Sequence, residues 1–205
     1  MSRVTRAAEA AALYAATDPD QRVVMNGLDW WRYETMLAVR GDRSIPRMTY
    51  LEGQLELMSP SRSHESIKKL LGRLLEAYAE EKGFVLEGLG SMTLRNPGAE
   101  RGAEPDECYA VGKVKEHPDL ALEVIWTHGG LDKLNVYSGL GVREIWIWED
   151  GKLRVHALRG QRYEEIAASE LLPEVDLALL ARLAAAESQT EGVRELRSIL
   201  RGVRT

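Results

Sequence analysis

The chain has little of what disulfide-bonded or membrane proteins need. Its 205 residues include a single cysteine, Cys108, which excludes an internal disulfide and is typical of a reducing compartment. No stretch approaches the roughly 20 consecutive apolar residues of a transmembrane helix, and the N-terminus lacks the apolar core and cleavage site of a signal peptide. We therefore expect a cytoplasmic protein without a membrane partner.

Zinc-binding and nucleotide-binding motifs are also missing. The four histidines are scattered, and none belongs to an HExxH motif or has a CxxC partner, which argues against a zinc site. The sequence contains no P-loop, no dinucleotide-binding fingerprint and no GxSxG elbow. These absences argue against P-loop NTPases, Rossmann-type dehydrogenases and α/β-hydrolases.

The charge balance limits how the protein could bind nucleic acid. The formal net charge is −5, so the molecule as a whole does not attract a polyanion. A nucleic acid would have to bind a local basic patch or a metal ion. This disfavours a protein that coats DNA without specificity, and it leaves a metal-dependent nuclease open.

One long amphipathic helix stands out among the predicted elements. It follows Pro60, can be capped by Ser61 or Ser63, and ends at Gly83. Its apolar positions recur at intervals of three and four residues, at Ile67, Leu70, Leu71, Leu74, Leu75 and Tyr78. Further helices are expected at residues 3–16, 28–39, 130–139, 174–187 and 191–202.

Short strands are expected between these helices. They form a hairpin at residues 48–58 and cover the segments 84–89, 91–95, 105–111, 118–126, 143–149, 153–158 and 162–167. This order predicts an α/β or α+β fold with a sheet flanked by helices. We expect an N-terminal helical extension over residues 1–27, one domain over 28–187 and a C-terminal helix over 188–205.

Two neighbouring strands carry carboxylates where metal chemistry could occur. Asp106 lies in the strand that Glu104 and Pro105 open, and Glu123 lies in the middle of the next strand, on the face of Ala121 and Ile125. An unpaired carboxylate buried there would cost several kcal/mol, and a metal ion or a lysine would remove that cost. Two such carboxylates with a cation nearby can hold a divalent ion against a phosphate.

Lys133 is the expected cation. It shares one stripe of the 130–139 helix with Val136, Tyr137 and Leu140, which predicts that it points inward near the end of the Glu123 strand. A lysine there can contact the attacking water or the charge that develops on the phosphate. The alternative is a snorkelling lysine paired with a surface acid.

Other polar residues are weaker candidates. His64 and Glu65 begin the long helix, and we expect His64 as a phosphate or water contact and Glu65 as a third metal ligand, unless His64 faces solvent. Glu56 is expected on the exposed face of its strand, opposite Leu55 and Leu57. Glu104 is expected to be solvated.

Several segments occur in an order and spacing that match one protein family. They cover residues 50–60, 63–65, 89–109, 118–124, 133–137 and 141–146. Over about residues 28–180 the chain resembles the Uma-two family of restriction-endonuclease-like nucleases, within the PD-(D/E)XK superfamily.

The resemblance implies a mixed central sheet with flanking helices and a divalent-metal phosphodiesterase site. Asp106 matches the aspartate of the PD motif, and Glu123 matches the second acidic residue. The lysine usually found two residues later is replaced by Ile125. In this family the lysine is thought to have moved to the following helix, where Lys133 stands.

Two hypotheses follow for the function. The first is an endonuclease that uses Mg²⁺ or Mn²⁺ to hydrolyse phosphodiester bonds in nucleic acid, with DNA as the expected substrate. Asp106 and Glu123 would bind the metal, and Lys133 and His64 would complete the catalytic set. The second, which Ile125 and the acidic net charge favour, is a catalytically inactive nuclease-fold module that binds nucleic acid or protein. A homodimer is compatible with both.

Overall fold

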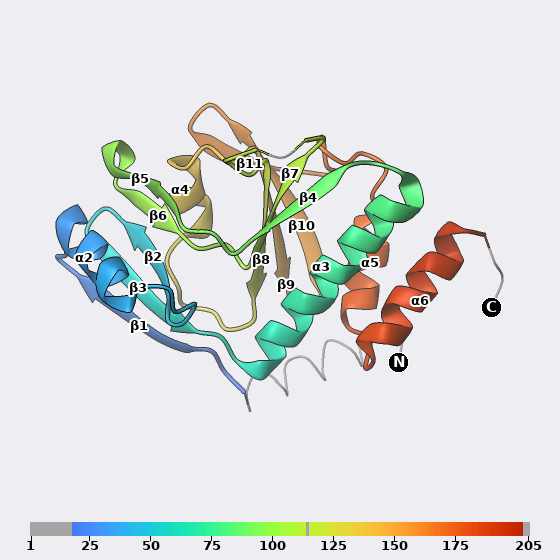
Figure 1. The fold of residues 1–205 in the computed structure, drawn as a ribbon, viewed down its shortest axis with the longest axis horizontal. Coiled ribbons are helices and arrows are strands. Elements are labelled where there is room, and N and C mark those ends of the chain that lie inside the picture. The colour runs from blue at the N-terminus through green and yellow to red at the C-terminus, as the bar shows by residue number, and fades with distance from the viewer. Residues whose placement is uncertain (1–17, 114, 203–205) are drawn as a thin grey trace.

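The computed structural model describes residues 18–113 and 115–202 (Figure 1). Within them the chain forms two β-sheets with helices packed around them, which confirms the predicted mixed α/β fold with flanking helices. The helix expected at residues 3–16 lies outside the described residues. In the described part of the chain, no helix combines the length and the apolar character needed to cross a bilayer.

The first sheet contains five strands in the order β1-β3-β2-β6-β5, and every neighbouring pair is antiparallel. The strands are β1 (Gln21–Asn26), β2 (Arg47–Leu51), β3 (Gln54–Ser59), β5 (Leu94–Asn96) and β6 (Arg101–Ala103). Helix α2 (Trp30–Arg40) packs against β2 and β3 through Tyr33, and it lies at one end of the molecule (Figure 1). A short 3-10 helix, η1 (Pro97–Ala99), connects β5 and β6.

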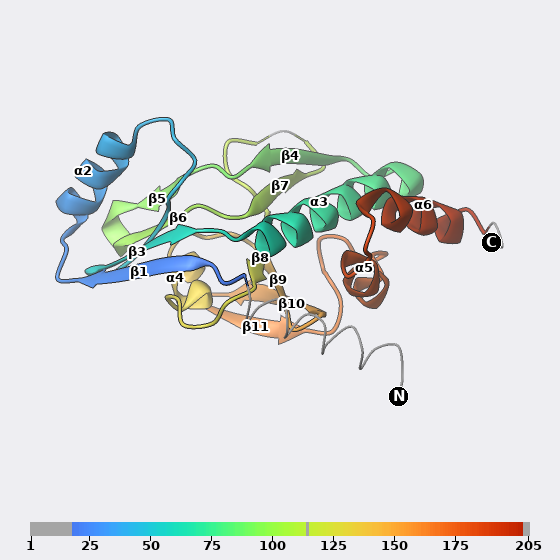
Figure 2. The same ribbon diagram turned by 90° about the horizontal axis from the view of Figure 1, so that it is seen from below.

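The second sheet contains six strands in the order β11-β10-β9-β8-β7-β4. The strands are β4 (Leu86–Gly90), β7 (Glu107–Val111), β8 (Leu120–Ile125), β9 (Glu144–Glu149), β10 (Lys152–Arg159) and β11 (Arg162–Ile166). Strands β8 and β9 are parallel, and α4 (Lys133–Ser138) lies in the connection between them. Helices α3 (Arg62–Lys82), α5 (Leu177–Ala184) and α6 (Gln189–Leu200) gather on the opposite face of this sheet from α4 (Figure 2).

Helix α3 begins and ends where the sequence predicts. The Ser61 hydroxyl accepts a hydrogen bond from the His64 backbone N–H at 3.1 Å, and Gly83 adopts the left-handed conformation with φ of 75°. The leucines of the predicted stripe are at most 2% exposed: Leu70, Leu71, Leu74 and Leu75. Because burying each leucine contributes about 1.5–3 kcal/mol, this stripe fixes α3 against the second sheet.

Strand β8 shows the predicted alternation. Its even-numbered residues lie in the core beneath α3: Leu120, Leu122 and Val124. Ala121 and Ile125 lie on the other face, in the core that α4 covers. Glu123 therefore faces the space between the second sheet and α4.

Two strands and the division into two sheets are not predicted by the sequence. Strand β1 lies inside the predicted N-terminal extension, yet it pairs with β3 along its whole length, from Gln21 opposite Ser59 to Asn26 opposite Gln54. It is an edge strand with Val23 57% exposed, so its sequence lacks a buried period-two face. Strand β6 has three residues, which is too short for any period to be recognised.

Candidate active site

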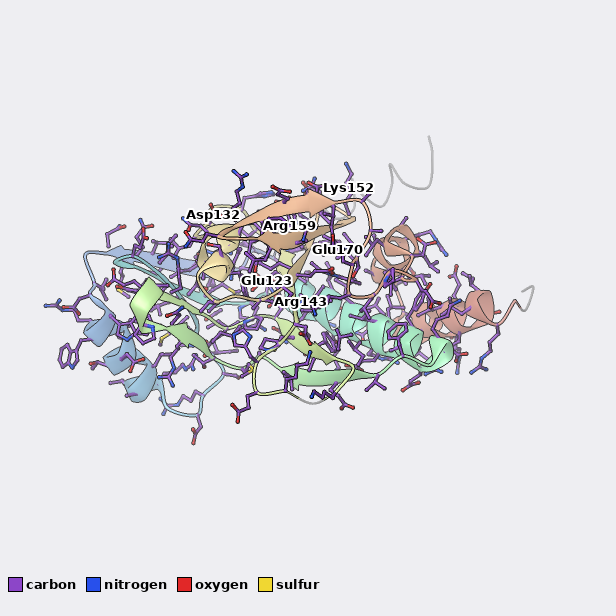
Figure 3. All side chains as sticks on the ribbon, turned by 90° about the horizontal axis from the view of Figure 1, so that it is seen from above. Glu123, Asp132, Arg143, Lys152, Arg159 and Glu170 are labelled. Carbon is purple, nitrogen blue, oxygen red and sulfur yellow. The ribbon has the colours of Figure 1, made fainter. Side chains whose placement is uncertain are left out.

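The sheet register brings Asp106 and Glu123 together. Strands β7 and β8 are antiparallel, with Glu107 opposite Leu122. Asp106 is the residue immediately before β7, and continuing this register by one residue sets it opposite Glu123. The two residues are 1% and 2% exposed. Figure 3 shows Glu123 inside the molecule.

Each oxygen of Asp106 has a partner. Oδ2 accepts a hydrogen bond from the Val124 backbone N–H at 2.7 Å. Oδ1 lies 2.9 Å from Nε2 of His64 and forms an ion pair with the Arg47 guanidinium. The carboxylate is therefore held in one orientation by groups from β8, α3 and β2.

His64 lies between two carboxylates and does not face the surface. It is 1% exposed, its Nε2 contacts Asp106, and its Nδ1 lies 3.2 Å from Oδ2 of Asp20. Ionised carboxylates only accept hydrogen bonds, so both contacts are hydrogen bonds only if both ring nitrogens carry protons. Burial alone would raise the pKa of Asp20, but the hydrogen bond and charge of His64 and the Ser61 N–H outweigh it and lower that pKa.

Glu123 is neutralised from α4. Its Oε2 lies 3.4 Å from Nζ of Lys133, and its Oε1 accepts a hydrogen bond from the Tyr137 hydroxyl. Burial and the charge of Glu123 hold the pKa of Tyr137 well above its usual value, so the phenol stays protonated and donates. Lys133 also lies 3.4 Å from Oγ1 of Thr49 in β2. It thus points inward, as the helix stripe predicts.

Glu65 lies next to this pair without contacting it. Its Oε1 is 2.7 Å from Arg47 and its Oε2 is 2.7 Å from Lys68, while its side chain is 41% exposed. Arg47 therefore bridges Glu65 and Asp106. No sequence signal identifies Arg47, because all five residues of β2 are buried and the strand shows no alternation.

The predicted exposure of Glu56 is wrong. Glu56 is 1% exposed because the loop before α4 covers it. Its Oε2 accepts a hydrogen bond from the Leu131 N–H at 2.9 Å and lies 3.3 Å from Nε of Arg22. Arg22 also donates to the carbonyl of Thr127 at 2.9 Å. Glu56 and Arg22 thus fix the loop that leads to Lys133.

The prediction that Glu104 is solvated is also wrong. Glu104 is 6% exposed, forms an ion pair with Arg40 of α2 and accepts a hydrogen bond from the Met48 N–H at 2.9 Å. Strand alternation does not reveal this contact, because α2 comes from a distant part of the sequence. Glu104 fastens α2 to the first sheet and lies outside the site.

The donor set fits a hard divalent cation. Carboxylate oxygens suit Mg²⁺, which uses one or two protein carboxylates and completes its shell with water and substrate phosphate oxygens. Among the described residues, no group of three or more His, Cys, Asp or Glu side chains is arranged to hold a metal ion, which disfavours a closed site of the zinc type. Asp106 and Glu123 are two buried carboxylates that can supply such oxygens.

Two comparisons with known proteins found a match. The model of the Uma2 family, described as "Putative restriction endonuclease", matches residues 30–186. A crystal structure described as "a putative nuclease belonging to DUF820", from Anabaena variabilis ATCC 29413, is similar with a TM-score of 0.50 and 11% identity. The match covers 73% of this chain and 97% of that chain, and it shows a shared fold. No curated protein is significantly similar.

Proposed function

The chain belongs to the Uma2 family of restriction-endonuclease-like proteins, and from this premise we propose that it is a metal-dependent endonuclease that hydrolyses phosphodiester bonds in DNA. One observation carries the proposal: Asp106, immediately before β7, and Glu123 of the adjacent strand β8 are both buried, and a lysine ammonium lies 3.4 Å from Glu123. A cytoplasmic location and a homodimer remain predictions.

Asp106 and Glu123 would hold the ion, either Mg²⁺ or Mn²⁺. When bound there, it supplies Lewis-acid stabilisation of the charge on the phosphodiester. Hydrogen bonds to metal-binding carboxylates fix their orientation. Here the Val124 N–H and His64 fix Asp106, and the Tyr137 hydroxyl fixes Glu123.

Lys133 is the residue proposed to act on the reacting phosphate. Its ammonium lies 3.4 Å from Glu123 and its side chain is 14% exposed, so it can stabilise negative charge that develops on the phosphate or orient the attacking water. His64 acts on Asp106 and not on substrate, because both ring nitrogens contact buried carboxylates. It is a positioning residue in this proposal.

A second candidate function is a catalytically inactive module that binds nucleic acid or protein. The observation that favours it is Ile125, which stands two residues after Glu123 and cannot replace a lysine. The two proposals differ in metal binding, because an ion that binds only the native state raises its stability. Absence of stabilisation by Mg²⁺ and Mn²⁺ would favour the inactive module.

Cleavage of supercoiled plasmid and single-stranded oligonucleotides with Mg²⁺ or Mn²⁺ tests the activity. We expect Asp106→Asn to lower the rate more than about a hundredfold, since it removes a proposed ligand. The exposed Asp42 gives a matched control, because Asp42→Asn makes the same change outside the site. Equal rates for the wild type and Asp106→Asn would contradict the assignment of the site. Circular dichroism establishes that both variants fold.

A further inference from the structure

A hollow of about 300 Å³ lies between α4 and the second sheet, with Lys133 in its lining. Ile125 and Ile147 of the sheet form its floor, and Leu134 of α4 lines the opposite side. Lys133 also lines it, while its Nζ is 3.4 Å from Glu123. The hollow and the proposed active site therefore share one wall.

The strand register places the hollow next to the proposed reaction centre. In the parallel pair β8–β9, Glu123 is opposite Ile147 and Ile125 is opposite Glu149. Ile125 lies two residues after Glu123, on the same face and about 7 Å further along the strand. A nucleotide adjoining a phosphate at Glu123 would therefore lie over Ile125.

The rim offers hydrogen-bonding groups without a free excess of positive charge. Glu149 accepts a hydrogen bond from Arg154 at 2.8 Å, so a phosphate would have to compete with Glu149 for that guanidinium. His156 is 9% exposed and is one of the polar residues that line the hollow, so it supplies part of a polar edge there.

Burial lowers the pKa of His156, so the ring is neutral at pH 7 and has one donor and one acceptor nitrogen. Arg154 adds a donor and Glu149 an acceptor. Apolar walls with a few polar groups at one edge suit a planar aromatic ligand, and the volume is at the small end of ligand pockets, which span roughly 300–1,000 Å³.

We propose that this hollow binds one unpaired nucleobase of the substrate strand, next to the phosphate that is cleaved. The inference rests on the proposed nuclease function and names its substrate class. A base that enters the hollow must leave its duplex partner, at an energetic cost that single strands and gaps avoid. The protein should therefore cleave single-stranded or gapped DNA about tenfold or more faster than continuous duplex.

Methyl NMR tests the hollow independently of cleavage. The chain has seven isoleucines, two of which form the floor of the hollow, while Ile45 and Ile199 are exposed elsewhere. Isoleucine δ1 methyls are labelled with ¹³C, and each of the four deoxynucleoside 5′-monophosphates is added without divalent ions. We expect the Ile125 and Ile147 signals to move with at least one nucleotide, and not with base-free 2-deoxyribose 5-phosphate.

A matched pair of variants locates the binding. Leu134→Trp fills the hollow from α4, whereas Leu179→Trp makes the same change at a half-buried leucine of α5. The nucleotide-dependent shifts should disappear in the first variant and remain in the second. Leu134→Phe replaces Leu134→Trp if the tryptophan variant does not fold.

The outcomes separate the hollow from the nuclease proposal. No shift of Ile125 or Ile147 with any nucleotide overturns the base site, even if the wild type cleaves DNA. Equal shifts with base-free sugar phosphate also overturn it, because the phosphate would then be the ligand. Base-dependent shifts in a protein that cleaves no DNA support the base site and count against the nuclease.

Discussion

Removing the Lys133 ammonium should lower the free energy of unfolding, because the buried Glu123 carboxylate loses its cationic partner. The Glu123 side chain is 3% exposed, and its two described partners are Lys133 at 3.4 Å and the Tyr137 hydroxyl. Lys133→Met keeps the apolar stem but leaves the carboxylate with the Tyr137 hydrogen bond alone. Breaking a buried ion pair by removing one partner typically costs 3–5 kcal/mol. Because Tyr137 still donates, we expect about 3 kcal/mol, near the lower end of that range.

Urea unfolding in the presence of EDTA measures this loss. For a chain of this length, about 3 kcal/mol corresponds to a decrease in Tm of about 6–12 °C. Lys152→Met at the exposed start of β10 is the matched control and should change the free energy of unfolding little. The double variant Lys133→Met/Glu123→Gln removes both charges and should recover most of the loss.

Two results would refute the reasoning. A loss below about 1 kcal/mol in Lys133→Met would mean that the pair behaves like an exposed salt bridge. A double variant as unstable as Lys133→Met would mean that the loss comes from packing of the lysine and not from the charge left on Glu123. Either result would show that the ion pair between Lys133 of α4 and Glu123 of β8 does not stabilise the fold as expected.

Two further predictions concern titration. Burial raises the pKa of Cys108 to about 11, so native protein at pH 8 should react with a thiol reagent far more slowly than urea-unfolded protein, and equal rates would contradict this. The pKa of Asp20 is lowered in the folded state, so its charge stabilises the fold above the unfolded value near 3.8, and this contribution is lost as the pH falls through the lowered value. The wild type should therefore exceed Asp20→Asn in free energy of unfolding at pH 6, with a gap that narrows below pH 4 in urea titrations; a constant gap would contradict the assignment.

Periodic elements of this fold are predictable from the sequence because burial imposes a period on them. The leucine stripe of α3 and the two faces of β8 are long enough for the apolar pattern to appear, and both agree with the structure. The strand period predicts which face of β8 carries Glu123. The helix period predicts that Lys133 points inward. Strand β1 cannot be predicted in this way, because an exposed edge strand has no buried face and therefore no apolar period.

Contacts between segments that are distant in the sequence cannot be predicted from the apolar periodicity. Asp20 and Arg47 each contribute to the Asp106 environment from outside the predicted motifs. Glu56 has a strand position that predicts exposure, yet the loop carrying Leu131 folds over it. Alternation reports which way a side chain points, but not what tertiary packing places above it.

The two basic partners of Asp106, His64 and Arg47, differ in how easily they can move away from its carboxylate. His64 contacts Asp20 as well as Asp106 and is 1% exposed, so moving it would leave two buried carboxylates without that partner. Arg47 differs, because its Nη2 already lies 2.7 Å from Glu65, whose side chain is 41% exposed.

Arg47 can therefore release Asp106 and keep an ion pair with the partly exposed Glu65, whereas His64 would keep only its contact with the buried Asp20. If a divalent cation takes over the charge of Asp106, Arg47 is the group that can move at the lowest cost, since a buried charge is expensive only while it lacks a partner. The guanidinium would then remain beside the site as a donor for a substrate phosphate. Glu65 can therefore contribute to the site without binding a metal ion. Its carboxylate offers the Arg47 guanidinium an ion-pair partner other than Asp106.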